Sequence, residues 1–487
     1  MAKVCLIYPR DLNLNFFPLG IGYIASSLIK DGHDVILLDM TKDDLSLLDK
    51  LKERKPDIVG ISITTPQLKL AEMVISRIRS IIPGVPIVAG GIHPSYFKDA
   101  FLDEFNVDYV VYGEGEVTML ELCDSIKKRP RNLSHIDGLI FRDENGKINV
   151  NPARKLIEDL NGIPFPARKL VNYETYLQPP GIIRGIWTNR CGNITTSRGC
   201  PGRCTYCGVN YLYENTYRRR SVDNVLEEID LMVSQYNIDG LYFMDDTFLM
   251  GTKWIEEFAE KFIARRYGIK WSCYGRVDTV NEKILGAIKK AGCVQVEYGI
   301  ESCSERVLKC IKKKTSFEQT TRAIKMTKDN GMRALGSFIF GFADDTVEDL
   351  TETITLASKI DLDFMTCFFA TPYPGSELYE QAVKENRILE RDMSNWYVRN
   401  SNIWKVKLDE KTIANYRNIF LKSYRHRNLL FFIRNPLFLL KLFVFMLKNF
   451  KALVKSIVRT IRERCPDDFG YYFYICLSEN LKNRNKI

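Results

Sequence analysis

Two successive series of short apolar strands, each followed by a helical stretch, constrain the fold of this chain most strongly. In both series the strands are bounded by Gly, Pro, Asn or Asp and alternate with amphipathic stretches. Such alternation is typical of parallel sheets covered by helices, so we predict an α/β protein with two sheets. The expected strands lie near residues 4–8, 34–38, 57–62, 86–89 and 107–112 in the first series, and near 194–197, 240–244, 270–274, 295–299, 334–340 and 364–370 in the second.

The length of 487 residues exceeds what one hydrophobic core normally supports, so we expect several domains. For residues 1–135, we predict a flavodoxin- or Rossmann-like α/β domain. Residues 190–390 predict a partial (β/α)6 barrel, with ligands at the carboxyl ends of its strands. Residues 391–487 are expected to be mostly helical. Between the two α/β domains, residues 136–189 predict a hairpin and then a linker marked by Pro164, Pro166, Pro179 and Pro180.

The net charge of +10 is concentrated in one segment, residues 422–464. This segment contains eleven Lys and Arg residues and a single acidic residue, Glu463. The rest of the chain is balanced, which argues against a generally basic nucleic-acid-binding protein. Within the segment, Arg434, Pro436 and Lys441 interrupt two strongly apolar runs, so a membrane-spanning helix is not expected. The pattern fits a helix lying in an anionic membrane interface. A helical bundle packed on the barrel is the alternative.

The amino-terminal residues indicate the compartment. Met1 to Pro9 leads directly into an apolar strand, without the charged and apolar regions of a secretory signal. Thirteen cysteines in a chain without an export signal are expected to be reduced, and some of them to bind metal. We therefore expect a cytoplasmic protein, at the inner membrane surface if residues 422–464 bind lipid.

Three cysteines, Cys200, Cys204 and Cys207, form a compact motif after the first strand of the second series. Their spacings of four and three residues fit a loop around a [4Fe–4S] cluster. Three thiolates on four irons leave one iron open to the amino and carboxylate groups of S-adenosylmethionine (SAM), whose reductive cleavage yields a 5′-deoxyadenosyl radical. A zinc site is the alternative, but it would need a fourth ligand. The chain has only four histidines and no second Cys-x-x-Cys.

With its surroundings, the cysteine motif resembles the radical SAM superfamily over about residues 190–390. The resemblance implies that Asp245 and Asp246 lie near the SAM amino group, and that Arg276, paired with Asp278, is a carboxylate partner. Tyr206, beside the last cysteine, would shield the cluster or belong to the core. The remaining residues implied to contact SAM are Glu297, Glu301 and Ser302 at the ribose and carboxylate, and Gly336 and Gly341 near the adenine.

The first α/β domain resembles the cobalamin-binding domain that precedes many radical SAM domains. Small residues at strand ends would let a planar corrin ring approach the backbone. The Asp-x-His-x-x-Gly signature of histidine-ligated cobalamin is absent, and His33 lies in the wrong context for it. His93 is expected to touch the cofactor or, alternatively, to cap its loop. The residues implied to contact cobalamin are Gly20, Ser62, Thr64, Gly90, Gly91, His93, Gly113 and Glu114.

These resemblances imply a cobalamin-dependent radical SAM enzyme that methylates an unactivated carbon of a hydrophobic or lipid-like substrate. It would need an external one-electron donor, such as flavodoxin or ferredoxin, and no nucleic acid. The first alternative is an oxidative cyclase or another radical rearrangement without methyl transfer, because the chain also resembles anaerobic magnesium-protoporphyrin monomethyl ester cyclases. The second alternative is a non-catalytic cobalamin or iron–sulfur sensor.

Overall fold

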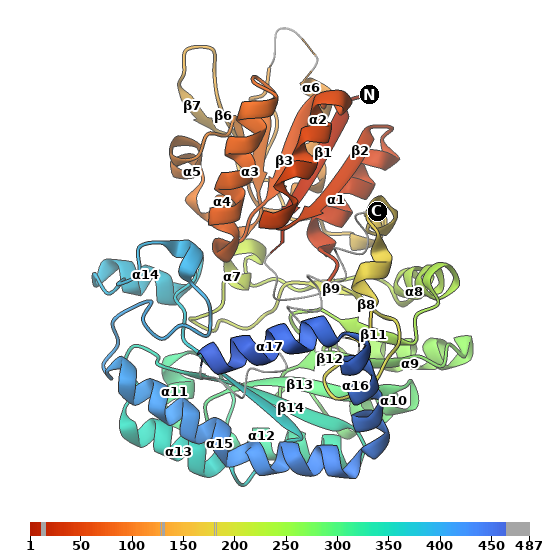
Figure 1. Ribbon diagram of the computed structural model, residues 1–487, viewed down its shortest axis with the longest axis vertical. Helices are drawn as coiled ribbons and strands as arrows, with labels where there is room; N and C mark the ends of the chain where they lie inside the picture. The colour runs from red at the N-terminus through yellow and green to blue at the C-terminus, as the bar shows by residue number, and fades with distance from the viewer. Residues whose placement is uncertain (11–15, 127, 129–131, 180, 182, 464–487) are drawn as a thin grey trace.

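A computed structural model of the chain describes residues 1–10, 16–126, 128, 132–179, 181 and 183–463. Pro180 of the expected linker, and residues 464–487 of the expected helical region, lie outside these described residues. Figure 1 shows two α/β units, one above the other, with the last helices against the lower unit. The predicted fold class, two α/β domains followed by a helical region, is confirmed.

The first sheet has the strand order β2-β1-β3-β4-β5-β6-β7, and its first five strands run parallel. Alternate residues of β1 pack on opposite faces: Val4 and Leu6 lie in one core with α1 and α6, and Cys5 and Ile7 in another with α3. The order of the first five strands is that of flavodoxin-like folds. The bounds are β1 Lys3–Pro9, α1 Leu19–Lys30, β2 Asp34–Met40, β3 Ile58–Ser62, α3 Leu68–Ile81, β4 Ile87–Gly90, α4 Ile92–Phe97, β5 Tyr109–Val111 and α6 Gly115–Ser125.

A hairpin of β6 (Leu139–Arg142) and β7 (Ile148–Val150) extends this sheet. The sequence predicts this hairpin as part of the connection between the domains, whereas in the structure β6 pairs antiparallel with β5. The reason is hydrophobic burial, because Leu139 and Ile140 are completely buried against the first domain. A free two-stranded hairpin would be only marginally stable in water.

The second sheet contains six parallel strands in the order β15-β14-β13-β12-β11-β8. Among the described strands β15 and β8 are its edges, so the barrel is open on one side. Helices cover its outer face; for example, Trp271 of β12 packs against Phe258 and Phe262 of α9. The bounds are β8 Cys191–Ile194, α8 Val222–Tyr236, β11 Gly240–Phe243, α9 Thr252–Arg265, β12 Lys270–Gly275, α10 Glu282–Lys290, β13 Cys293–Glu301, α11 Glu305–Cys310, α12 Phe317–Asp329, β14 Arg333–Phe340, α13 Val347–Ala357, β15 Phe364–Phe369 and α14 Glu377–Lys384.

The first barrel strand begins earlier than predicted. One strand is predicted near residues 194–197, but β8 ends at Ile194 and Ser197–Arg198 form a separate short strand, β9. β9 pairs antiparallel with β10 (Arg218–Arg219). The change of direction after Ile194 brings the following cysteine loop over the carboxyl end of the sheet.

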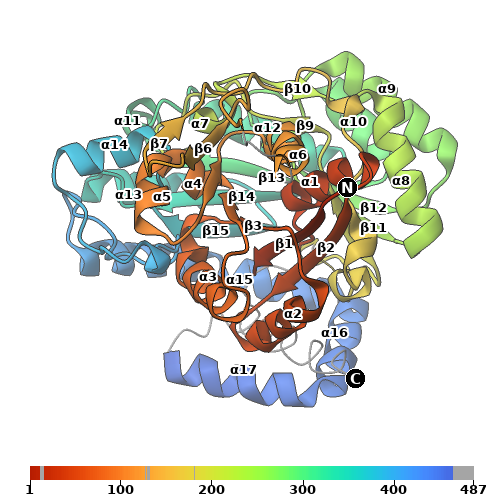
Figure 2. The same cartoon turned by 90° about the horizontal axis from the view of Figure 1, so that it is seen from above.

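Three helices complete the described chain: α15 (Glu410–Arg434), α16 (Pro436–Lys448) and α17 (Phe450–Glu463). α15 packs on the outer face of the barrel, where Phe420 meets Phe338 and Phe340 of β14 at ring-centroid distances of 4.8 and 5.2 Å. Figure 2 shows α16 and α17 at one side of the molecule, at its periphery. Within the described residues, no helix has the length and apolar character needed to cross a bilayer.

Candidate cofactor site

The loop between β9 and α7 (Val209–Tyr213) carries the three cysteines. Gly199 starts it with a φ of +87°, and a Cβ there would lie 2.3 Å from the carbonyl oxygen of Thr216, so only glycine fits. Cys204 is buried, and Cys200 and Cys207 are half-buried. The backbone N–H of Cys207 donates to the carbonyl of Cys204 at 3.1 Å, which folds the loop tightly. All three thiols are free, as ligation requires.

The arrangement of the three thiols fits a cluster better than a single ion. Among the described residues, the group of potential ligands whose atoms all lie within 4.8 Å of one another is Asp31, His33 and Asp124, and no cysteine belongs to it. Sulfurs around one zinc would lie about 3.8 Å apart. Burial raises the pKa of Cys207 to about 11, so bound iron would have to drive its deprotonation. Three free cysteines in one short loop are a donor set that an iron–sulfur cluster can use.

Arg276 supplies positive charge beside this loop. A Cβ at Gly202 would lie 2.9 Å from the guanidinium Nη1 of Arg276, so the two residues are in close contact. Arg276 also forms the expected ion pair with Asp278, at 2.8 Å. A guanidinium here offsets the negative charge of three thiolates, and it remains a proposed partner for the SAM carboxylate.

A buried hydrogen-bonded triad forms one wall next to the cysteines. The Tyr206 hydroxyl donates to Oε1 of Glu301 at 2.9 Å, and Nζ of Lys313 donates to the same oxygen at 2.9 Å and to the Tyr206 hydroxyl at 3.2 Å. Glu301 ends β13 with a φ of +67°, where the strand register shifts. Burial and the Glu301 carboxylate raise the pKa of Tyr206, which keeps its proton. Sequence reasoning missed Lys313, because a run of three lysines resembles a solvated surface.

The two aspartates after β11 have different surroundings. Asp245 accepts hydrogen bonds from the backbone N–H and hydroxyl of Thr196, at 2.9 and 2.7 Å, and from the Ser197 hydroxyl. It therefore braces the chain entering the cysteine loop. Asp246 accepts a hydrogen bond from the backbone N–H of Gly199. Although the residue keeps an exposed surface, loss of solvent around its carboxylate, together with Asp245, raises its pKa to about 6. Asp246 is thus the aspartate that contacts the loop itself.

The other four residues expected at SAM occupy four different places. Glu297 lies within β13, four residues before Glu301, where its carboxylate accepts a hydrogen bond from the Gln295 side chain at 3.1 Å. Ser302 faces α13, where its hydroxyl pairs with that of Thr353 at 2.9 Å. Gly336 packs outward, since a Cβ there would lie 2.8 Å from Ile300 and Leu362. Gly341 follows β14 and donates its N–H to Asp345 at 2.9 Å.

The carboxyl ends of the first sheet face the cysteine loop. A Cβ at Gly208, directly after Cys207, would lie 3.3 Å from Cδ1 of Ile92, which follows β4. The Tyr211 hydroxyl donates to the carbonyl of Ser95 at 2.9 Å. After β1, the backbone N–H of Phe17 donates to the Asn193 side chain at 3.1 Å. A ligand at this sheet edge would therefore lie next to the cysteine loop.

Several residues expected at cobalamin gather at this edge. Gly20 and Gly113 have open space where a Cβ would be, as a planar ring requires. Gly91 has a φ of +99°, and a Cβ there would lie 2.6 Å from the carbonyl of Ile63, so its conformation is fixed by the backbone. Ser62 ends β3, and Gly90 ends β4. The backbone N–H of Thr64 is used locally, donating to Gln67 at 2.8 Å.

Glu114 is engaged by the barrel. Its carboxylate accepts from Arg198 at 2.7 Å, from Arg218 at 2.8 Å and from the backbone N–H of Ile157 at 2.7 Å. Although burial opposes ionisation, the two guanidiniums lower the pKa of Glu114. Arg198 also pairs with Glu116. Glu114 is thus a link between the domains, and this leaves no carboxylate oxygen without a partner to bind cobalamin.

His93 lies behind the sheet edge. It is buried among Phe97 and Phe101, with ring centroids 4.6 and 5.9 Å away, and its Nδ1 is 3.0 Å from the Thr65 hydroxyl. Burial lowers its pKa to about 4, so the imidazole is neutral. The alternative reading, a histidine that holds its own loop, agrees with these contacts.

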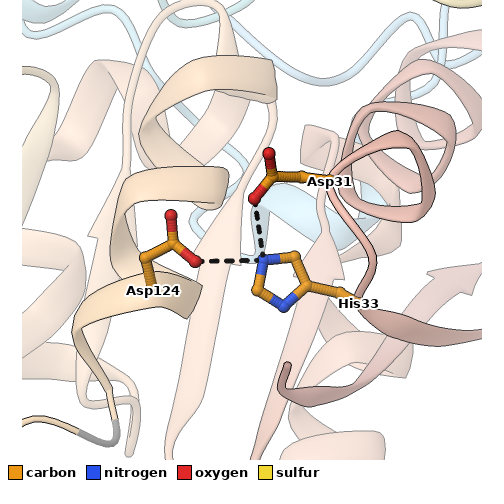
Figure 3. A group of neighbouring side chains, drawn as sticks. All are labelled: Asp31, His33 and Asp124. Atoms are coloured by element: carbon orange, nitrogen blue, oxygen red, sulfur yellow. Dashed lines mark ion pairs between the residues drawn. The ribbon is translucent and has the colours of Figure 1, made fainter.

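His33 lies in a separate cluster with Asp31 and Asp124 (Figure 3). Its Nε2 is 3.8 and 3.4 Å from their carboxylates. Its Nδ1, however, accepts a hydrogen bond from the backbone N–H of Ala2 at 3.0 Å. The proton of the neutral ring must then reside on Nε2, which therefore points a donor, not a lone pair, at the carboxylates. This group is not a metal site.

Comparisons with known proteins match both α/β units. Residues 194–357 match the radical SAM superfamily, and residues 10–123 match the B12 binding domain. The uncharacterized methyltransferase PH0819 of Pyrococcus horikoshii is 35% identical, over 87% of this chain and 92% of that protein. An anaerobic magnesium-protoporphyrin IX monomethyl ester cyclase of Rubrivivax gelatinosus is 30% identical, over 86% and 78%. A solved structure of the cobalamin-dependent S-adenosylmethionine radical enzyme OxsB, with aqua-cobalamin and S-adenosylmethionine bound, matches with a TM-score of 0.72 at 20% identity, over 100% and 75% of the chains.

The matches agree with the geometry of the site. The three cysteines lie in the radical SAM region, and the sheet edge that faces them lies in the B12-binding region. The predicted cofactors, a [4Fe–4S] cluster, SAM and cobalamin, are therefore confirmed at the level of the family. The sensor alternative is not supported, because the relatives are enzymes. This chain belongs to the family of cobalamin-dependent radical SAM enzymes, which includes methyltransferases and magnesium-protoporphyrin cyclases.

Proposed function

We propose that this chain methylates an unactivated carbon of a hydrophobic, lipid-like substrate, with electrons from a flavodoxin or ferredoxin. The observation that carries the proposal is the contact between Ile92, after β4, and Gly208, after Cys207. This contact would bring cobalamin next to the cluster and SAM. Methyl transfer and hydrogen abstraction on one substrate require this proximity. When bound, these cofactors supply one-electron chemistry and a transferable methyl group that side chains cannot provide.

Side chains of this chain would bind the cofactors and form the walls of the site that contains them. Cys200, Cys204 and Cys207 would ligate iron, and Arg276 would offset their charge. The triad of Tyr206, Glu301 and Lys313 would form a fixed wall, because each member is hydrogen-bonded to the other two. Asp246 would complete the site from the β11 side.

The inner wall of the barrel supports a largely apolar substrate. Phe338 and Phe340 face α15 outside the barrel, so the alternate residues Ser337 and Ile339 face inward. Ser337 is hydrogen-bonded at 3.1 Å to Thr366 of β15, which therefore shares that face. The inward residues Ser337, Ile339, Thr366 and Phe368 are all half-buried. This part of the inner wall, with isoleucine, phenylalanine and two hydroxyls, would suit an apolar body with a few polar groups.

Oxidative cyclisation is the second candidate. A magnesium-protoporphyrin ester cyclase matches 86% of the chain at 30% identity, close to the coverage of the methyltransferase relative. Both reactions need the same cofactors in the same positions. They differ in the fate of the substrate radical.

The two outcomes can be separated by product analysis. The reconstituted protein would be incubated anaerobically with reductant, a total lipid extract of the producing cells, and SAM carrying deuterium in its methyl group. Methylation predicts 5′-deoxyadenosine, S-adenosylhomocysteine and a deuterated lipid. Formation of 5′-deoxyadenosine with an oxidised, unlabelled product would instead establish the cyclase reaction. A protein that forms no 5′-deoxyadenosine would contradict both.

A further inference from the structure

The helices α16 and α17 expose an unusual amount of apolar surface. Ten of the thirteen residues of α16 are apolar. Four large side chains three to four residues apart lie on its outer face, with exposed fractions of 68% for Leu437, 58% for Leu440, 54% for Phe443 and 50% for Leu447. On α17, the residues Phe450, Val454, Ile457 and Val458 are also exposed. Contiguous apolar surface of this kind marks a binding surface.

The opposite side of α16 holds it on the protein. Phe438 and Phe445 pack against Trp187, with ring centroids 6.3 and 5.9 Å apart. Trp187 lies four residues before β8, one of the two edge strands of the open barrel. The apolar outer face is therefore the side of the helix turned away from its own support, and the helix lies near the edge strand β8.

Lysines border this apolar surface. Lys441 and Lys448 lie next to the exposed stripe of α16, and Lys451 lies at the start of α17; all three are exposed. Within the described part of the chain, they form none of the observed ion pairs. From Asn435 to Val458 the sequence contains no acidic residue. Large apolar side chains flanked by lysines are typical of helices that lie in an anionic membrane interface.

We propose that α16 and α17 dock the enzyme on an anionic phospholipid bilayer. Charge favours a bilayer over a second copy of the chain, because a symmetric dimer through this face would bring lysines against lysines. Bound lipid headgroups would instead neutralise them, while the apolar stripe enters the acyl region. The inference goes beyond the proposed function and does not depend on it. If both hold, the membrane lies where a lipid-like substrate could enter the open barrel.

The test is co-sedimentation of the full-length, cluster-loaded protein with vesicles. Vesicles of phosphatidylcholine mixed with phosphatidylglycerol are compared with vesicles of phosphatidylcholine alone. We expect binding to the anionic vesicles that weakens as salt is added, because exposed charges are screened. A protein that remains in the supernatant with anionic vesicles would overturn the proposal. Its oligomeric state would then show whether a second copy covers the face.

Two variants test the two parts of the surface. The first, Leu440→Ser with Phe443→Ser, removes two exposed apolar side chains and is expected to lower the partition coefficient at least tenfold. Its matched control, Ile263→Ser with Leu389→Ser, changes two exposed apolar residues elsewhere and should bind as the unmodified chain does. Equal binding by the surface variant and its control would refute a role for the apolar stripe.

The second variant replaces the lysines Lys441, Lys448 and Lys451 by Gln. Each near-surface lysine is worth roughly a fivefold change in binding to an anionic membrane, so the loss should again exceed tenfold. The matched control makes the same change in net charge at exposed lysines of other elements, Lys52, Lys69 and Lys283. If the control loses as much binding as the variant, the attraction comes from net charge and the docking surface is disproved. SAM cleavage in the absence of vesicles should be unchanged in all four variants, which separates this test from that of the proposed function.

Discussion

At the residue scale, the carboxylate of Glu114 determines how the two α/β units meet. It follows β5 of the first unit and binds Arg198 and Arg218 of the second. Arg198 lies two residues before Cys200, so this link fixes the start of the cysteine loop relative to the first sheet. Replacing one partner of such a buried group leaves the other charges unpaired, which is more costly than losing an exposed ion pair.

We therefore expect Glu114→Gln to lower the free energy of unfolding by about 3 kcal/mol, measured by urea unfolding of the full chain. It should also weaken the binding of hydroxocobalamin, measured by its absorbance, because the sheet edge loses its fixed position. The control is Glu121→Gln, which removes an ion pair with Arg154 at a more exposed site and should cost less than about 1 kcal/mol. Equal losses in both variants would contradict the role of Glu114.

His93 provides a pH-dependent test of the first domain. Burial lowers its pKa from the ordinary value of 6.5 to about 4, and its neighbours Thr65, Phe97 and Phe101 are uncharged. Between these pH values the unfolded chain binds a proton that the folded protein does not, so folding stability falls as the pH falls. The contribution of His93 is fully present above about pH 6.5 and is lost by about pH 4, up to about 3 kcal/mol.

The variant His93→Gln removes this titration. We expect the difference in unfolding free energy between about pH 7 and about pH 4.5 to be smaller in the variant than in the unmodified chain, by about 2–3 kcal/mol. Urea unfolding of both proteins at the two pH values measures it. The same pH dependence in both proteins would show that His93 is not buried in its neutral form.

The residues that sequence reasoning identified, and those it missed, differ in the range of their contacts. The cysteine loop was predictable because three ligands and their glycines lie within ten residues. The partners of Glu114 were not, since Arg198 and Arg218 follow it by 84 and 104 residues. Lys313 was missed because its run of three lysines resembles a solvated surface, and only the folded barrel brings it to Tyr206, 107 residues away. Local motifs are visible in a sequence, whereas ion pairs between domains are not.

At the scale of elements, the strands were predictable from apolar runs. The exact start of a strand and its pairing partner were not always predictable. All six barrel strands were expected, yet the chain turns after Ile194, so that the first strand begins at Cys191. Thr195 and Thr196, which follow Ile194, are β-branched residues that favour a strand, so they give no signal of the turn. The hairpin of β6 and β7 was recognised as a hairpin, but its pairing with β5 depends on a sheet edge that the sequence does not reveal.

Substitutions at two glycines, each at the boundary of a helix or strand, test the described backbone geometry. Gly91 links β4 to α4 with a φ of +99° and a Cβ position 2.6 Å from the Ile63 carbonyl, so Gly91→Ala should destabilise the protein by about 3 kcal/mol. Gly20 lies in α1 with open space around it, so Gly20→Ala should stabilise the protein by up to about 1 kcal/mol. Thermal unfolding of both variants checks the opposite signs. A shift of the same sign for both would contradict the described geometry.

At the scale of the whole molecule, two sheets present their carboxyl ends to each other with the cysteine loop between them. Contacts at Ile92–Gly208, Phe17–Asn193 and Tyr211–Ser95 join the units at several points around this loop. This arrangement places the B12-binding region and the radical SAM region on two sides of one site. The proposed chemistry at this site therefore depends on a cluster that would be held by three thiolates and would keep one iron free for SAM.

The most direct test is the electron paramagnetic resonance spectrum of the reduced, reconstituted full-length protein, recorded with and without SAM. We predict the signal of a [4Fe–4S] cluster whose g-values shift when SAM binds the open iron, and no such cluster when Cys200, Cys204 and Cys207 are all replaced by Ser. A spectrum that SAM leaves unchanged, a signal that survives in the triple variant, or a protein that holds zinc in place of iron would contradict the account.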